Sequence, residues 1–145
     1  MSAIREQAVL DAPVPAVWEL VSDLRRYPEW FPRVFEIQGE RFEEGAEVVM
    51  LSRQPLVGRD EARLLIDRVD ELREIRMHCT VSGFFVHWQL TDAQGGTFLD
   101  AEFGIDPIRR RDRLMDLAGG RRFLRRWLVD AVAGLKRAAA VGSRV

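Results

Sequence analysis

The feature that most constrains the fold is the spacing of hydrophobic residues, which changes twice along the chain. After Pro13, apolar side chains recur every three or four positions, which indicates an amphipathic helix. From Val34 they alternate with polar residues, which indicates strands, and after Pro107 the helical spacing returns. A run of strands followed by one long helix predicts an α+β protein in which that helix covers one face of an antiparallel sheet.

The expected elements follow from this pattern and from its turn residues. A first strand spans residues 3–10, and Pro13 opens a helix that Pro28 ends, with a short turn over residues 29–32. Short connections rich in glycine and proline predict hairpins, so we expect a curved sheet of about seven strands. The other six strands are expected at residues 34–42, 47–53, 61–69, 74–82, 84–91 and 97–105.

Length and composition narrow the class of protein. The chain has 145 residues, 47% of them hydrophobic and 31% charged, which predicts one domain over residues 1–145. No apolar stretch is long enough to span a membrane, and the charged N-terminus does not resemble a signal peptide, so we expect a cytoplasmic protein. One cysteine and two histidines argue against a disulfide framework and against a metal site, and no motif indicates a cofactor.

Charge is distributed unevenly along the chain. Residues 109–145 contain eleven basic and three acidic residues, whereas residues 1–108 contain eleven basic and twenty acidic ones. The basic segment is interpreted as a solvated helix face or as a docking face for an acidic partner, an anionic membrane or nucleic acid. We favour the solvated face, expect no DNA binding, and find nothing that indicates an oligomeric state.

The hairpin over residues 74–91 is the most informative piece of the expected sheet. A two-residue turn at Ser82-Gly83 would place Cys79 opposite Val86 and His78 opposite His87. The histidines would share the polar face, where a solvated pair is favoured over a metal site. The inner face would carry Ile75, Met77, Cys79, Val81, Phe84, Val86, Trp88 and Leu90.

Arg68 is the candidate charged group of the interior. Strict alternation after Ala62, Leu64 and Ile66 would turn its side chain toward the apolar face. Its head could reach solvent at the rim, or it could be a fixed cation that holds a carboxylate, enolate or phenolate. The alternation does not decide between these interpretations. Asp100 and Glu102 are expected to point outward, which disfavours chemistry by paired carboxylates.

Several segments resemble one known superfamily. They are VWELVSD (residues 17–23), YPEWFP (27–32), HW (87–88), GGT (95–97) and EF (102–103). Together with the element order, they resemble the helix-grip fold of the START-like and Bet v 1-like superfamily. The resemblance covers nearly the whole chain and is closest to the polyketide cyclase/dehydrase branch.

The resemblance implies a ligand cavity between the sheet and the C-terminal helix. In aromatase/cyclases of this branch, a pocket arginine orients a poly-β-ketone and stabilises its enolate, and the matching residue here is Arg68. Where the family has a pocket tyrosine and a pocket glutamine, this chain has Val34 and Ala101. The loss of these two polar groups favours binding over catalysis. The resulting candidate ligand-binding residues are Tyr27, Trp30, Leu64, Ile66, Met77, Cys79, Val86, Trp88, Phe103, Leu124 and Leu128.

Three functions remain open at this stage. The first is binding or cyclisation of a polyketide-like molecule, delivered by an acidic carrier protein that docks at Arg122, Arg125 and Arg126. The second is a carrier or chaperone for a lipid or quinone, because the segment from Tyr27 to Pro32 also resembles the coenzyme Q-binding branch. The third, and the least favoured, is a ribosome-associated interaction protein.

Overall fold

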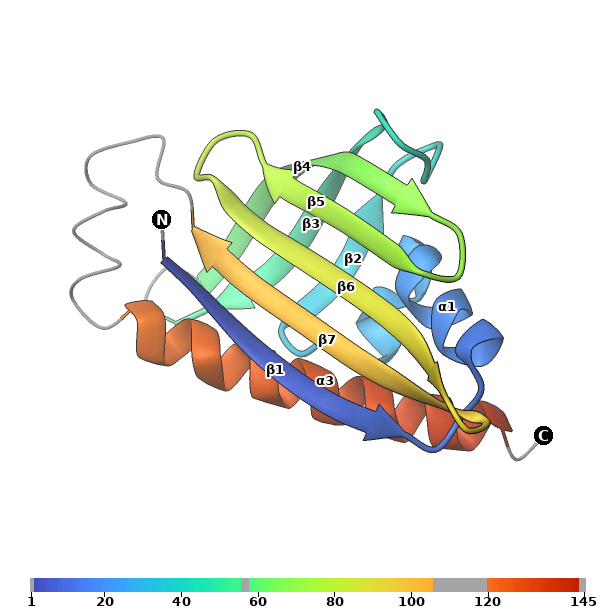
Figure 1. Ribbon diagram of the computed structural model, residues 1–145. Helices are drawn as coiled ribbons and strands as arrows, with labels where there is room; N and C mark the ends of the chain where they lie inside the picture. Colours follow the sequence, from blue (N-terminus) through green and yellow to red (C-terminus); the bar gives the residue numbers. More distant parts are fainter. Residues whose placement is uncertain (1, 56–57, 106–119, 144–145) are drawn as a thin grey trace.

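A seven-stranded antiparallel sheet curves around one long helix in the computed structural model, which describes residues 2–55, 58–105 and 120–143 (Figure 1). The strands lie in the order β1-β7-β6-β5-β4-β3-β2. This is the architecture expected of a helix-grip fold. The elements are β1 (Ser2–Leu10), α1 (Val14–Ser22), η1 (Leu24–Glu29), β2 (Val34–Gln38), β3 (Glu47–Gln54), β4 (Gly58–Asp70), β5 (Glu74–Cys79), β6 (Phe84–Ala93), β7 (Gly96–Ile105) and α3 (Arg121–Ser143).

The first helix is shorter than expected. α1 ends at Ser22, and a 3-10 helix, η1, continues from Leu24 and contains Pro28. The break occurs at Asp23, whose carboxylate accepts a hydrogen bond from the backbone N–H of Arg25 (3.2 Å) and so caps the new helix. The expectation of a single helix up to Pro28 was therefore wrong.

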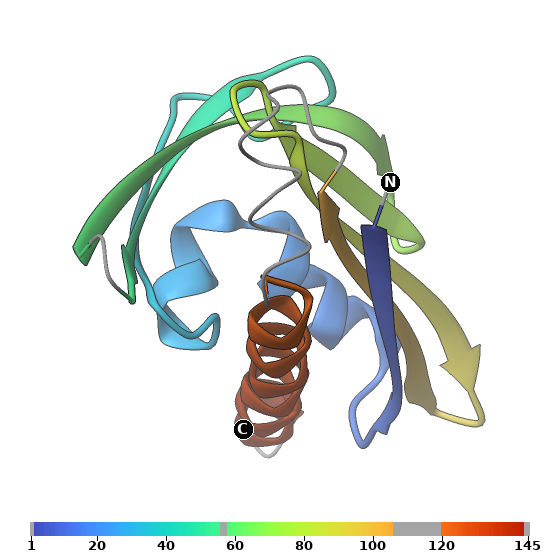
Figure 2. The ribbon, with the colours of Figure 1, turned by 90° about the vertical axis from the view of Figure 1, so that its left-hand side faces the viewer.

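The sheet arches over α3, and α1 and η1 also lie under the arch (Figure 2). Leu124, Leu128, Ala131 and Leu135 are buried along one stripe of α3, as the helical spacing predicts. The interior is therefore enclosed by the concave face of the sheet and by three helical segments.

Gly134 fixes the position of α3 against η1. It is buried, and a Cβ atom added to it would overlap the backbone carbonyl oxygen of Trp30. The two backbones thus approach as closely as they do only because residue 134 has no side chain. Trp127 adds a second attachment, since its Nε1–H donates a hydrogen bond to the carbonyl oxygen of Pro32 (2.7 Å).

The β5–β6 hairpin differs from its expected register by two residues. Met77 opposes Val86, whereas the two-residue turn would have placed Cys79 there. The connection is longer than expected, from residue 80 to residue 83, and the Gly83 N–H donates to the Cys79 carbonyl oxygen (3.0 Å). An even shift leaves the strand residues on their expected faces. Val81 is the exception, because it lies in the connection and is 47% exposed.

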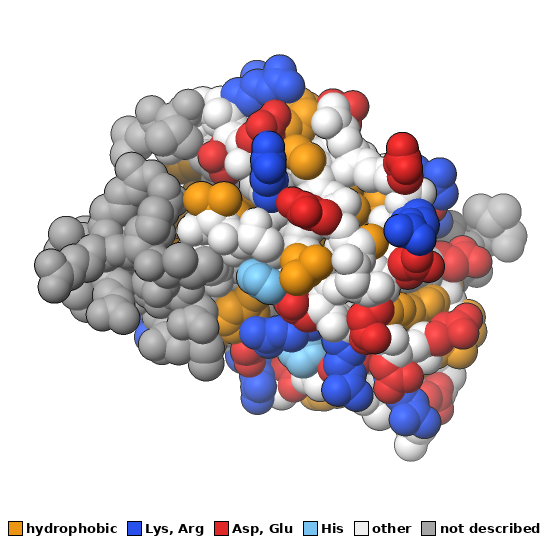
Figure 3. Space-filling model, turned by 90° about the horizontal axis from the view of Figure 1, so that it is seen from above, with side chains coloured by type: hydrophobic (Ala, Val, Ile, Leu, Met, Phe, Trp, Pro, Cys, Tyr) orange, Lys and Arg blue, Asp and Glu red, His pale blue; other side chains and the backbone are white. Residues whose placement is uncertain are grey.

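The convex face of the sheet carries charged side chains of both signs, with histidine among them (Figure 3). Arg5 on β1 pairs with Asp100 (3.3 Å) and with Glu102 (3.0 Å) on β7. The expected outward orientation of these two carboxylates is thereby confirmed. Phe85 lies on this face opposite His78 and is nevertheless buried, and the Arg76 guanidinium lies 4.4 Å from its ring centroid.

Candidate functional site

The interior between the sheet and α3 contains a cluster of seven aromatic side chains. Neighbouring ring centroids in this aromatic cluster lie 4.8 to 6.1 Å apart, mostly in tilted or edge-to-face pairs. Its members come from η1 and the segment that follows it, from β6 and β7, and from α3, so it joins these parts of the fold. Its members are Tyr27, Trp30, Phe31, Phe84, Trp88, Phe103 and Trp127.

The structure places the candidate ligand-binding residues together. All eleven lie in one hydrophobic core, each with at most 5% of its surface exposed. Cys79 is a buried free thiol within this core, as its inward position predicts. Their role in binding a ligand stays a prediction, because side chains that pack a core would be buried in the same way.

Arg68 does not enter the interior. Its side chain is 61% exposed, and its Nε lies 2.6 Å from Glu74 Oε1 on the convex face. The reason is a register shift in β4: Ile66 opposes Met77, but Arg68 opposes Arg76. The extra residue reverses the alternation, so an arginine expected to point inward points outward.

This geometry removes the expected cation from the interior. The next residue, the partly buried Val69, packs against the core in its place. Stabilisation of an enolate by Arg68 depended on an inward side chain, so the structure gives that role no support.

The polar groups of the aromatic cluster are satisfied with one exception. The Tyr27 hydroxyl donates to the Val21 carbonyl oxygen (2.7 Å), and Trp30 Nε1–H donates to the Leu20 carbonyl oxygen (3.2 Å). Trp88 is fully buried, and its Nε1 has no hydrogen-bond partner among the described residues. The Tyr27 oxygen lies near this N–H without the geometry of a full hydrogen bond.

Burial controls the chemistry of Tyr27. It raises the pKa of the phenol well above its ordinary value, and the neighbouring N–H of Trp88 opposes this shift only in part. The hydroxyl is therefore protonated at neutral pH. In that form it can donate or accept a hydrogen bond, but it does not act as a base.

Tyr27 also gives a prediction for alkaline solution. An unfolded tyrosine ionises near pH 10, whereas the folded chain favours the protonated form. This stabilisation is present below about pH 10 and is lost as the pH rises further. Tyr27 is the only tyrosine in the chain, so tyrosinate absorbance reports it alone. We expect that absorbance to appear only as near-UV circular dichroism is lost, and ionisation of the folded protein near pH 10 would contradict the burial.

Sequence reasoning missed three members of the aromatic cluster as site residues. Phe31, Phe84 and Trp127 are buried and all contact Phe103, and Trp127 also contacts the other two. Trp127 could have been found, because it lies three positions after Leu124 on the apolar stripe of the helix. Phe31 lies after η1, where no period indicates a face.

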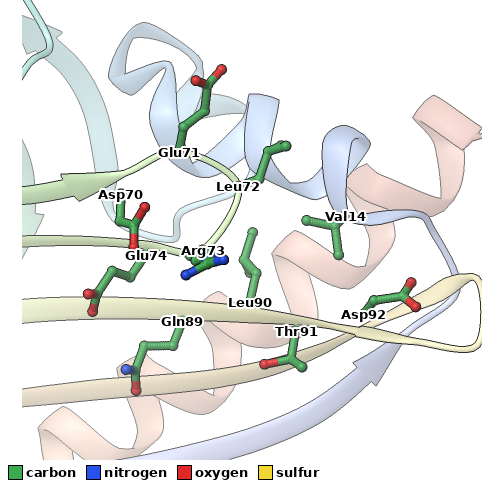
Figure 4. Close-up of a pocket in the computed structure, with 10 residues that line it drawn as sticks. All are labelled: Val14, Asp70, Glu71, Leu72, Arg73, Glu74, Gln89, Leu90, Thr91 and Asp92. Atoms are coloured by element: carbon green, nitrogen blue, oxygen red, sulfur yellow. The ribbon is translucent and has the colours of Figure 1, made fainter.

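An open cleft of about 760 Å³ lies outside this interior (Figure 4). The β4–β5 turn, β6 and the start of α1 form its walls, and none of the candidate ligand-binding residues lines it. Val14, Leu72 and Leu90 supply its apolar surface, and most of its other lining side chains are charged. Its carboxylates come from Asp70, Glu71, Glu74 and Asp92. This lining suits an apolar ligand less well than the interior does.

The histidines do not oppose each other as expected. His78 opposes Phe85 and pairs with Asp67 (2.7 Å), whereas His87 pairs with Glu74 (2.7 Å). The hydrogen bond from His87, aided by the charge of Arg68, lowers the pKa of the Glu74 carboxyl. Within the described ranges, no three His, Cys, Asp or Glu side chains are grouped so that they could hold a metal ion.

The basic face of the C-terminal helix is exposed to solvent. Arg122, Arg125 and Arg126 all lie on the outer side of α3, and Val129 beside them is 42% exposed. Docking of an acidic carrier protein there stays a prediction. The arginines between residues 109 and 113 belong to the same basic segment but lie outside the described residues.

These features define a helix-grip domain with an aromatic interior. Residues 1–140 match the sequence model of a family described as polyketide cyclase / dehydrase and lipid transport. The chain belongs to this family, as the resemblance in its sequence predicted. No curated protein sequence is similar enough to count as a match.

Solved structures share the fold at low sequence identity. A protein from Nitrosomonas europaea is 13% identical with a TM-score of 0.77, and the match covers 99% of this chain and 97% of that one. The Zhui aromatase/cyclase from Streptomyces sp. R1128 is 16% identical (TM-score 0.71; 96% and 93% covered). The di-domain aromatase/cyclase StfQ of the steffimycin biosynthetic pathway is 19% identical (TM-score 0.73), and the match covers 98% of this chain but 50% of StfQ.

The part of the chain that the structure describes contains no helix that is both long and apolar enough to cross a membrane.

Proposed function

We propose that this protein binds an uncharged, largely apolar molecule with a carbonyl group in the interior between the sheet and α3. The observation that carries the proposal is the buried Nε1–H of Trp88, which forms no full hydrogen bond among the described residues and has only the Tyr27 oxygen near it. Leaving such a donor unpaired costs about 1–3 kcal/mol. A ligand carbonyl would accept this hydrogen bond while its rings pack against the aromatic cluster.

The charge of the interior supports a neutral ligand. The buried polar side chains among the described residues are those of Ser52 and Thr97, and the Thr97 hydroxyl already donates to the Ala12 carbonyl oxygen (2.7 Å). A carboxylate taken into this environment would lose its hydration without gaining a cationic partner there. A quinone or a neutral polyphenol therefore fits better than an ionised fatty acid.

The same geometry favours binding over arginine-assisted cyclisation. Arg68 lies on the convex face, and Tyr27 stays protonated, so neither supplies a cation or a base to the interior. The second candidate function is aldol cyclisation of a polyketide, in which the Trp88 N–H would polarise a carbonyl. The family description, which joins cyclases with lipid transport, is compatible with both.

Ligand entry requires the aromatic rings to separate, because the described side chains of the interior already contact one another. We therefore expect association to be slower than a diffusion-limited encounter. A planar ligand that stacks between the rings would replace the contacts that they lose.

Trp88→Phe tests the proposal, with Arg68→Gln as its control. Intrinsic tryptophan fluorescence would be titrated with a neutral quinone, a neutral polyphenol and a fatty acid. We expect saturable quenching by the neutral quinone and the neutral polyphenol, and about tenfold weaker binding of the quinone by Trp88→Phe, the effect of one lost hydrogen bond. Arg68→Gln should bind as the wild type does. Tightest binding of the fatty acid, or equal binding by Trp88→Phe, would overturn the proposal.

A further inference from the structure

Three side chains form a distinct arrangement on the convex face, away from the aromatic cluster. The guanidinium carbons of Arg53 on β3 and of Arg59 on β4 each lie 5.5 Å from the ring centroid of Phe35. Phe35 is 37% exposed and lies at the register shift between β2 and β3. One aromatic ring thus holds two exposed guanidinium groups at the surface.

The two arginines occupy directly opposing positions. Arg53 pairs with Arg59 in the β3–β4 register, and like charges in this arrangement destabilise a hairpin. Neither side chain forms an ion pair with a carboxylate of the described residues. The nearby Glu36 on β2 and Glu61 on β4 both lie opposite Leu51 of β3 in the strand register. Neither glutamate forms an ion pair with Arg53 or Arg59. The guanidinium donors are therefore available to an external anion.

The number of charges and donors favours a phosphate group over a carboxylate. A carboxylate has one charge and two oxygens, which one guanidinium fork satisfies. A phosphomonoester carries roughly 1.5 to 2 negative charges and three terminal oxygens, so it can accept from both forks at once. It would also relieve the repulsion between the two arginines.

We propose that Arg53 and Arg59, held by Phe35, bind a phosphomonoester group whose organic part contacts the exposed edge of that ring. The phosphate could belong to a soluble ester or to a lipid headgroup such as phosphatidate. The chemistry at the arginines is the same for both sources. This site is independent of ligand binding in the interior.

The test compares three variants of the full chain, each of which replaces one arginine by glutamine and so removes one positive charge. Phenyl phosphate would be titrated while its phosphorus NMR signal is followed, and sedimentation with phosphatidate-containing phosphatidylcholine vesicles would test the lipid source. We expect Arg53→Gln and Arg59→Gln each to weaken binding about tenfold or more, the effect of lost hydrogen bonds to a charged group. Arg63→Gln, a matched variant on the same face of β4, should weaken it less than about twofold.

A measurement of stability distinguishes specific binding of the phosphate at Arg53 and Arg59 from nonspecific attraction of an anion to positive charge. In phosphate-free buffer, Arg59→Gln should unfold at a higher urea concentration than the wild type, because the opposed charges are gone. Added phenyl phosphate should raise the midpoint of the wild type and of Arg63→Gln, but not that of Arg59→Gln. Equal weakening by all three variants, or binding that never saturates with either source, would overturn the proposal.

Discussion

Gly134→Ala is expected to destabilise the folded protein by about 3 kcal/mol. Helix propensity alone predicts the opposite, a gain of about 1 kcal/mol when alanine replaces glycine inside a helix. The added Cβ would overlap the carbonyl oxygen of Trp30, which belongs to the backbone and cannot turn aside. α3 would have to move away from η1 and from the interior that both elements enclose.

Urea denaturation of Gly134→Ala would measure this effect. Asp130→Ala is the matched control, since it adds helix propensity on the exposed side of the same helix. It should change the free energy of unfolding by no more than about 0.5 kcal/mol. A Gly134→Ala protein as stable as the wild type would show that α3 does not pack against Trp30 as described.

Trp127→Ala is expected to cost about 4 kcal/mol or more, near the upper end for large buried aromatic residues. The indole stacks on Phe84 at a centroid distance of 5.4 Å and meets Phe31 and Phe103 edge-on. Its loss would leave a cavity and would also deprive the Pro32 carbonyl oxygen of its donor. Both effects act at the junction of α3 with the segment after η1.

Trp127→Phe separates the two contributions. It keeps an aromatic ring in the cluster but removes the N–H, so we expect a loss of about 1–2 kcal/mol. Chemical denaturation of both variants gives the comparison. A loss below about 1 kcal/mol for Trp127→Ala would contradict the position of this side chain in the core.

The hydrophobic period predicted much of the fold because it reports which face of an element is buried. It placed Met77, Trp88 and Phe103 inside, and the error of two residues in the β5–β6 register did not change this. A register shift by an even number of residues leaves each side chain on the same face of the sheet. The face of a residue could therefore be predicted more reliably than its cross-strand partner.

A single extra residue in a strand cannot be recognised from the alternation of hydrophobic and polar residues in the sequence. The irregularity between Ile66 and Arg68 reverses the side chains that follow it in β4, and no glycine or proline lies next to it. The sequence therefore predicted the apolar wall of the interior but not its lack of an arginine. The lack of a full hydrogen bond at the Trp88 N–H could not be predicted either, because it depends on which residues surround the side chain in the folded protein.

The most direct test of ligand binding in the interior is an NMR titration with a neutral quinone that follows the backbone amide signals and the four tryptophan indole N–H signals. We expect the Trp88 indole proton to shift most, toward the position of a hydrogen-bonded N–H. Contacts from the ligand to Trp88 and Phe103 should appear in nuclear Overhauser spectra. Shifts confined to residues 70–74 and 89–92, which line the open cleft, would contradict binding in the interior.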